Sequence, residues 1–164
     1  MLCFRRKLGS AIFMEAANEP TLQDSISDRL GYVLRRASGV MMGALGVALA
    51  EIGLRPVEAT ILILVGANTG CTQSEISRLL GIKRANMVPL MAGLVNKRLI
   101  ERYPVDGRSF ALSLSLEGVA QRDAADAIML AHERRFEALF SGQDIEALRV
   151  ALARIAQLDT AAQE

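Results

Sequence analysis

Seven basic side chains fall within residues 72–109, against three acidic ones, and the rest of the chain is slightly acidic. The basic residues are Arg78, Lys83, Arg84, Lys97, Arg98, Arg102 and Arg108. Lysine and arginine neutralise phosphates, so a near-neutral protein that collects them in one segment has the charge pattern of a nucleic-acid contact. We interpret this excess as a phosphate-binding face, with an ordinary solvated face as the alternative.

The sequence offers little for catalysis or metal binding. It has one histidine, His132, and two cysteines, Cys3 and Cys71. Two cysteines form neither a disulfide framework nor a zinc site, which favours a cytoplasmic protein without metal or cofactor. No nucleophile, base and stabiliser cluster together, so we expect no enzyme, and His132 is expected at the surface or at an interface. Cys71 precedes a predicted helix whose dipole would lower the thiol pKa; a redox switch is therefore an alternative to an inert thiol.

A long apolar helix is predicted over residues 26–52, capped by "SISD" and ended by "GLRP". Its helical spacing carries Leu30, Val33, Leu34, Val40, Met41 and Leu45. The uncharged run of this helix, Ala37 to Ala50, is shorter than the roughly 18 residues that a membrane span needs, so no membrane is expected. Gly39 and Gly43 have the spacing that lets a second helix pack closely.

The middle of the chain predicts two further helices and a helix–turn–helix unit. Pro56 suits the first turn of a helix whose apolar second half indicates burial on all sides. Thr72 and Glu75 form a capping box that begins a short helix over 73–80, expected to bury Ile76, Leu79 and Leu80. After a turn at Gly81, the next helix carries an apolar stripe. The stripe consists of Met87, Leu90, Met91, Leu94 and Val95.

The period then changes from 3.6 to 2 residues. "SFALSLSL" predicts a strand with Phe110, Leu112, Leu114 and Leu116 on its buried face, and "LIERYP" is its expected partner. "VDGR" between them supplies the Asp-Gly pair of a tight turn. Helices are predicted over 117–140 and after the cap "SGQD". The last helix is expected to turn Ile145, Leu148, Leu152 and Ile155 inward.

These elements predict a mainly α fold with a small two- or three-stranded β wing, a winged helix-turn-helix flanked by dimerisation helices. We divide the chain into an N-terminal arm (1–25), a dimerisation helix (26–55), a DNA-binding unit (56–116) and C-terminal dimerisation helices (117–164). The arm is expected to be flexible and is no signal peptide, since Gly9 and Glu15 interrupt its apolar run; Met14 is an alternative start. The 51% hydrophobic content leaves apolar surface for a second subunit.

"TQSEISRLLGI", the helix ending "LVNKRLIER", the turn "DGRS" and the strand "FALSLSLEG" together resemble the multiple antibiotic resistance regulator family, MarR. The resemblance covers about residues 27–159. It implies a two-fold dimer, held by the first helix and the last two, that binds a pseudo-palindromic site on double-stranded DNA as a repressor. It also implies release by a small-molecule effector, and Met41 and Met42 are candidates to line the effector pocket.

The outward face of the second helix of the unit is small: Ala85, Asn86 and Pro89 lie on it. Asn86 is the candidate to pair with an adenine edge, while Ala85 and Pro89 suit thymine methyl groups. Pro89 inside a helix removes a hydrogen bond. We expect a distorted start, either a kink near Ala85 or a helix that begins with Asn86 as its cap.

The remaining site residues are candidates for phosphate and minor-groove contacts. Arg108 is expected to enter the minor groove with Asp106 orienting its guanidinium, which matches the wing motif of the family together with Ser109. The phosphate candidates are Thr72, Gln73, Ser74, Lys83, Arg84, Arg98 and Arg102. Arg98 stands where the family often has glycine. Because the reading face is poor in hydrogen-bonding groups, a winged-helix module that binds protein rather than DNA is the alternative function.

Overall fold

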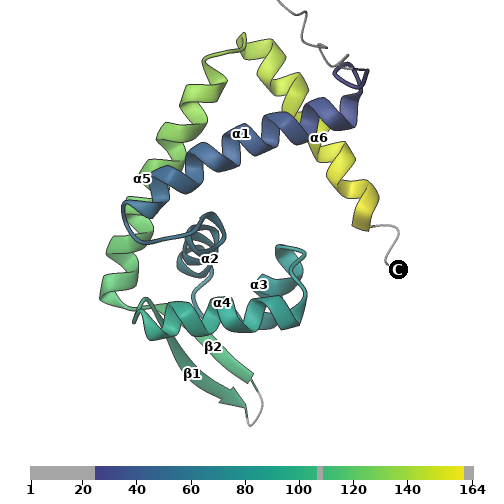
Figure 1. Cartoon of the computed structure of the whole chain (residues 1–164). Coiled ribbons are helices and arrows are strands. Elements are labelled where there is room, and N and C mark those ends of the chain that lie inside the picture. The colour runs from purple at the N-terminus through teal and green to yellow at the C-terminus, as the bar shows by residue number, and fades with distance from the viewer. Residues whose placement is uncertain (1–24, 107–108, 161–164) are drawn as a thin grey trace, which may run out of the picture. The chain divides into compact units, whose positions relative to one another are not determined.

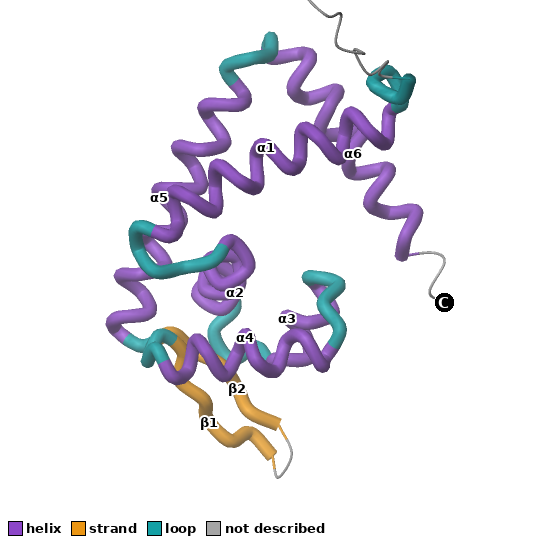
Figure 2. The backbone as a smooth tube through the Cα atoms, in the orientation of Figure 1, coloured by secondary structure: helices purple, strands orange, loops and turns teal. Residues whose placement is uncertain are grey.

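The computed structural model describes residues 25–106 and 109–160, which form helices and a single hairpin (Figures 1 and 2). In chain order the elements are α1 (Leu30–Ala50), α2 (Pro56–Ala67), α3 (Gln73–Leu79), α4 (Arg84–Asn96), β1 (Ile100–Asp106), β2 (Ser109–Leu114), α5 (Leu116–Glu137) and α6 (Gly142–Thr160). The predicted fold class is confirmed. Each segment with a strong hydrophobic period forms the helix or strand predicted for it, and the observed ends differ from the predicted ends by a few residues.

The hairpin of β1 and β2 forms the wing. β1 and β2 pair antiparallel, and an isolated bridge between Thr72 and Ala111 adds a short third segment to the sheet. The register shifts between Pro104 and Asp106, which leaves Asp106 paired with Ser109. Asp106 is therefore the last residue of the strand, and the prediction that an Asp-Gly pair forms the centre of the turn is wrong for Asp106. Gly107 and Arg108 lie outside the described residues.

The core forms where α2 meets α4, β2 and α5. Ile61, Leu62 and Val65 of α2 are fully buried, and Met87, Met91 and Leu94 of α4 are buried with them. Burying a side chain of this size stabilises the fold by about 1.5–3 kcal/mol, so this cluster provides much of the stability of the helices and hairpin that surround it. Figure 1 shows α2, α3 and α4 beside the hairpin. The predicted apolar stripe of α4 is confirmed.

Two leucines and one phenylalanine are more exposed than predicted. Leu79 is 67% exposed, because α3 ends at this residue and only Ile76 among its apolar side chains is fully buried. Leu116 is 90% exposed, because Ser115 caps α5 and the chain leaves the sheet after Leu114. Phe110 is half-exposed, so the inward face of β2 reaches full burial only at Leu112.

The chain divides into two compact units within α1, after Arg36. In the first unit "SISD" is not the cap of α1: these residues form a turn and bend, and the helix begins at Leu30. In the second unit Leu45 and Leu49 are buried, whereas Val40 and Val47 are exposed. A side chain at Gly39 or Gly43 would meet nothing within 4 Å, so the expected partner helix is not supplied by the described part of this unit.

α1 is long and apolar enough to cross a membrane by length and composition, a test that core helices of soluble proteins also pass. α6 also has an exposed apolar face, as α1 does, because Leu148, Leu152 and Ile155 are all more than one-third exposed. The prediction that these three side chains are buried is therefore wrong for the single chain. The predicted cap is confirmed, with the Ser141 hydroxyl accepting from the Asp144 amide at 3.3 Å.

His132 and Cys71 have structural surroundings that differ from those predicted. His132 is buried rather than exposed, and its Nε2 lies 2.9 Å from the carbonyl oxygen of Met41, which joins α5 to α1. Burial, followed by the negative charge of Glu75, raises the pKa of the Cys71 thiol. The expected lowering by the helix dipole is therefore wrong, and a thiol protonated at neutral pH is a poor nucleophile for a redox switch.

Glu58 is a buried carboxylate in the first turn of α2. Burial by itself raises its pKa, but hydrogen bonds from Arg55 and Lys97 outweigh burial and hold the pKa of Glu58 below its usual 4.5. A folded-state pKa below the unfolded one contributes stability above pH 4.5, and this contribution is lost as the pH falls through the lowered value. We expect the melting temperature to fall less steeply below pH 4.5 in Glu58→Gln than in the parent protein. Parallel slopes in melting curves recorded at a series of pH values would contradict this linkage.

Arg98 ends the turn after α4 with a backbone φ of 58°, the only positive value for a non-glycine residue among those described. This left-handed conformation costs roughly 1–2 kcal/mol in residues with a Cβ and suits glycine. Relief of this strain is only partly offset by the extra chain entropy that glycine loses on folding, so we expect Arg98→Gly to raise the free energy of unfolding by about 0.5–1 kcal/mol. The control is Arg98→Ala, which removes the guanidinium but keeps the strain. Denaturant titration of both variants should show stabilisation in the glycine variant alone.

Candidate nucleic-acid interface

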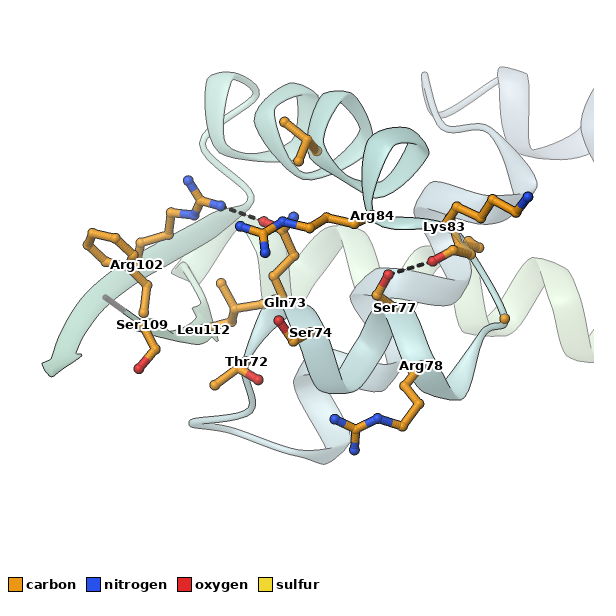
Figure 3. Close-up of a pocket in the computed structure, with 14 residues that line it drawn as sticks. Thr72, Gln73, Ser74, Ser77, Arg78, Lys83, Arg84, Arg102, Ser109 and Leu112 are labelled. Atoms are coloured by element: carbon orange, nitrogen blue, oxygen red, sulfur yellow. Dashed lines mark hydrogen bonds between the residues drawn. The ribbon is translucent and has the colours of Figure 1, made fainter. Parts of the chain in front are cut away.

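A groove of about 680 Å³ lies between the start of α3, the start of α4 and the hairpin (Figure 3). Among the described side chains, four basic and no acidic ones line it. The lining residues are Thr72, Gln73, Ser74, Ser77, Arg78, Gly81, Ile82, Lys83, Arg84, Val88, Arg102, Ser109, Phe110 and Leu112. The structure thus brings together seven of the predicted site residues: Thr72, Gln73, Ser74, Lys83, Arg84, Arg102 and Ser109. An unbalanced positive charge in a concave surface concentrates potential that attracts anions.

Arg102 projects from β1 across the groove to α3. Its guanidinium donates to the side-chain oxygen of Gln73 at 2.7 Å and lies 5.8 Å from the centre of the Phe110 ring. These two contacts hold the guanidinium in one orientation. The N–H groups of Arg102 that do not bond to Gln73 can donate to an incoming acceptor. Arg102 is therefore an orientated cation rather than a freely moving surface charge.

The other basic side chains come from α3 and from the start of α4. In Figure 3 the guanidinium of Arg84 extends toward Gln73 and Arg102, so two positive charges approach the same part of the groove. Lys83 extends in the opposite direction. The turn between α3 and α4 is held by the Ser77 hydroxyl, which donates to the Ile82 carbonyl at 2.5 Å. This bond fixes the point from which Lys83 and Arg84 leave the backbone.

The start of α3 is already capped. The Thr72 hydroxyl accepts from the Glu75 amide at 3.3 Å, and the Glu75 carboxylate accepts from the Thr72 amide at 2.7 Å. The Thr72 amide and, at 2.9 Å, the Thr72 hydroxyl both donate to the Glu75 carboxylate and lower its pKa, so Glu75 stays negatively charged at neutral pH. The predicted capping box is confirmed. A phosphate at this end of α3 would meet the Glu75 carboxylate, so Thr72 is a weaker candidate than Arg84 or Arg102.

The outward face of α4 carries Ala85, Asn86 and Pro89, all exposed. The helix begins at Arg84 with Lys83 as its cap residue, and the amides of Asn86 and Met87 both donate to the Lys83 carbonyl. The alternative that Asn86 caps the helix is therefore wrong, and Pro89 lies inside the helix. Its ring leaves the Ala85 carbonyl without the usual amide donor. Asn86 keeps its side chain available for other contacts.

Several groove residues were missed by the sequence analysis. Arg78, two residues after the buried Ile76, lies on the opposite side of α3, as helical spacing would have indicated, and Ser77 lies between the two. Phe110 was expected inward. Arg98 does not join this groove: it lies with Glu101 and Glu117 in a second groove at the base of the hairpin. The side chain of Asp106 and the whole of Arg108 lie outside what the structure describes.

The comparisons agree with this geometry. A family model described as the MarR family matches residues 52–109. A transcriptional repressor named CouR, bound to a 23-mer DNA duplex, is 34% identical; the match covers 83% of this chain and 99% of that chain, with a TM-score of 0.77. The chain belongs to the MarR family. CouR bound to p-coumaroyl-CoA is 31% identical, with 83% and 98% of the two chains covered and a TM-score of 0.76.

Another solved structure, a probable transcriptional regulator from Pseudomonas aeruginosa, is 30% identical; the match covers 79% of this chain and 98% of that chain, with a TM-score of 0.72. No curated protein matches the sequence. Members of the MarR family are transcriptional regulators. The candidate effector residues Met41 and Met42, on α1, are outside both grooves described above.

Proposed function

We propose that the protein is a homodimeric transcriptional repressor that binds a pseudo-palindromic operator and is released by a small-molecule effector. The observation that carries the proposal is the basic groove between α3, α4 and the hairpin. In this proposal the phosphate backbone enters the groove, with Arg84 and Arg102 as its main contacts, and the outward face of α4 enters the major groove.

Few side chains on the outward face of α4 can contact base edges. Asn86 is our candidate for bidentate pairing with adenine, and Ala85 and Pro89 for thymine methyl groups. Arg108 remains a proposal for the minor groove, with Asp106 beside it in sequence. Since this face offers little direct hydrogen bonding, operator selection would depend on the deformability of DNA as much as on base edges.

Dimerisation is supported by the exposed apolar faces of α1 and α6. Val40 and Val47 of α1 and Leu152 and Ile155 of α6 have no cover within the described parts of their unit. Large exposed apolar faces of a monomer indicate a protein interface. We propose that residues 26–55 and 117–164 form it, which would place two α4 helices about one turn of DNA, roughly 34 Å, apart. Such a repressor acts in the cytoplasm.

The test is DNA binding as a function of salt. Fragments selected from genomic DNA by the purified protein supply the operator, and log Kd is then measured against log salt. Several phosphate contacts predict a steep slope, about 0.9 per phosphate. Binding that does not depend on salt, or a protein that selects no fragment, would favour the alternative of a protein-binding winged-helix module, which the small uncharged face of α4 would suit.

The effector class can be tested on the same complex. Because a relative binds p-coumaroyl-CoA, a coenzyme A thioester is the first ligand to try. An effector that releases DNA must bind the free form more tightly than the DNA-bound form, and by linkage the operator must weaken effector binding by the same factor. Titrations in both directions measure the two factors.

A further inference from the structure

The turn between α1 and α2 accepts hydrogen bonds from side chains of α5 and of the residue that ends α4. The amides of Ile52 and Leu54 donate back to the Leu49 carbonyl in the last turn of α1, which ties the turn to that helix. The Ile52 carbonyl accepts from Gln121 of α5 at 2.5 Å. The next carbonyl, that of Gly53, accepts from Lys97 Nζ at 2.9 Å. The end of α1 is therefore bonded to both α5 and the end of α4.

Lys97 makes a second contact that explains a buried charge. Its Nζ also lies 3.2 Å from Glu58 Oε1, and the side chain of Glu58 is 3% exposed. The other carboxylate oxygen accepts from the Arg55 amide at 2.9 Å, and the Arg55 guanidinium donates to Oε1 at 3.3 Å. A buried carboxylate needs such partners, and removing one of them is costly because the remaining charge stays buried.

Lys97 directly follows α4, the helix whose outward face we propose to read DNA, and its Nζ contacts the Gly53 carbonyl and the Glu58 carboxylate. We propose that Lys97 and Glu58 position α4: they set the distance and angle between the end of this helix and the turn after α1. The inference rests on the proposed function. It adds a route by which a shift of α1, in a dimer or with an effector, moves the reading helix.

The positioning role differs from a phosphate contact in a measurable way. Lys97 is a cation in the basic segment, and its side chain is 41% exposed, so the simpler alternative is that it neutralises a phosphate. A substitution at Glu58 distinguishes the positioning role from the phosphate contact, because a buried carboxylate cannot touch DNA. Removing a negative charge near DNA should tighten binding by electrostatics alone. Removing a positioning contact should weaken binding, which is the opposite sign.

The experiment compares Glu58→Gln with Glu51→Gln on the full chain. Glu51 is an exposed carboxylate in the same turn, so the control makes the same charge change. Kd is calculated per active molecule, from the stoichiometry of a titration, so that unfolded protein does not count as weak binding. We expect Glu58→Gln to weaken DNA binding about tenfold, a size typical of residues that modulate coupling between sites, and Glu51→Gln to leave it unchanged or slightly tighter.

Lys97→Met is the second variant, for use if Glu58→Gln does not fold, since it keeps the aliphatic stem. We expect a similar tenfold loss with an unchanged slope of log Kd against log salt. A slope reduced by about one would identify Lys97 as a phosphate contact and overturn the inference. Unchanged affinity in Glu58→Gln would also overturn it. If the parent protein binds no DNA, the proposed function itself fails, and this result is distinguishable from either.

Discussion

DNA affinity is expected to fall about 100-fold when Arg84 and Arg102 are both replaced by alanine. Both guanidinium groups approach the same part of the groove, and Arg102 is held in place by Gln73 at 2.7 Å and by the Phe110 ring. A charge-assisted hydrogen bond contributes about 1.5–3 kcal/mol, so each arginine accounts for roughly tenfold in Kd. The loss should be similar for operator and unrelated DNA, since phosphates carry no sequence.

The salt dependence provides the sharper measurement. Losing two phosphate contacts should reduce the slope of log Kd against log salt by about two. The matched control is the replacement of Arg134 and Arg135 by alanine, two exposed residues of α5 that are not among the groove residues. If this control weakens binding as much as the groove variant does, the effect comes from the net charge of the protein and the groove has no special role.

Local patterns in the sequence predict most of the fold because they act over a few residues. The reciprocal bonds between Thr72 and Glu75 depend only on their spacing of three. Pro56 in the first turn of α2 replaces an amide that has no helical partner in any case. The stripe of α4 that includes Met87 and Met91 follows from the helical period. Such features survive whatever the rest of the chain does.

Faces and surroundings were harder to predict, because periodicity shows that a face is apolar but not what covers it. Leu152 and Ile155 have the spacing of buried residues, yet no described part of the chain packs over them. Cys71 shows a second limit. Its position before α3 suggested a lowered pKa, but burial and the Glu75 carboxylate act in the other direction. Both depend on distances that the sequence does not contain.

The same distinction applies to the candidate site. The charge excess pointed to residues 72–109, and seven of the predicted site residues in this segment line one groove. The contact between Arg102 and Gln73 joins residues 29 positions apart and requires the hairpin to fold back on α3. The turn of the hairpin depends on the register shift after Pro104, which moves Asp106 into the strand. Non-local pairing of this kind has no short-range sequence signal.

Gly118 is the position at which the smallest substitution should cause the largest loss of stability. It lies in the first turn of α5, where its amide donates to the Ser115 hydroxyl at 2.9 Å. A Cβ at this position would overlap the carbonyl oxygen of Leu99 and lie 2.9 Å from the carbonyl carbon. That carbonyl accepts from the Ser115 amide at 3.2 Å, and the Ser115 hydroxyl also donates to the Arg98 carbonyl. The overlap is therefore with a backbone group that is itself held in place.

We expect Gly118→Ala to lower the free energy of unfolding by about 3 kcal/mol, at the upper end of the cost of overpacking. For a chain of this length the melting temperature should fall by roughly 6–12 °C. Gly93→Ala is the control, since a Cβ there has only the Glu58 carboxylate near it, at 3.9 Å, and alanine favours the helix. An equal loss in both variants, measured by thermal unfolding, would show that helix glycines are sensitive here in general. A loss in Gly118→Ala alone would show that the start of α5 and the turn between α4 and β1 must approach within the space that only glycine leaves.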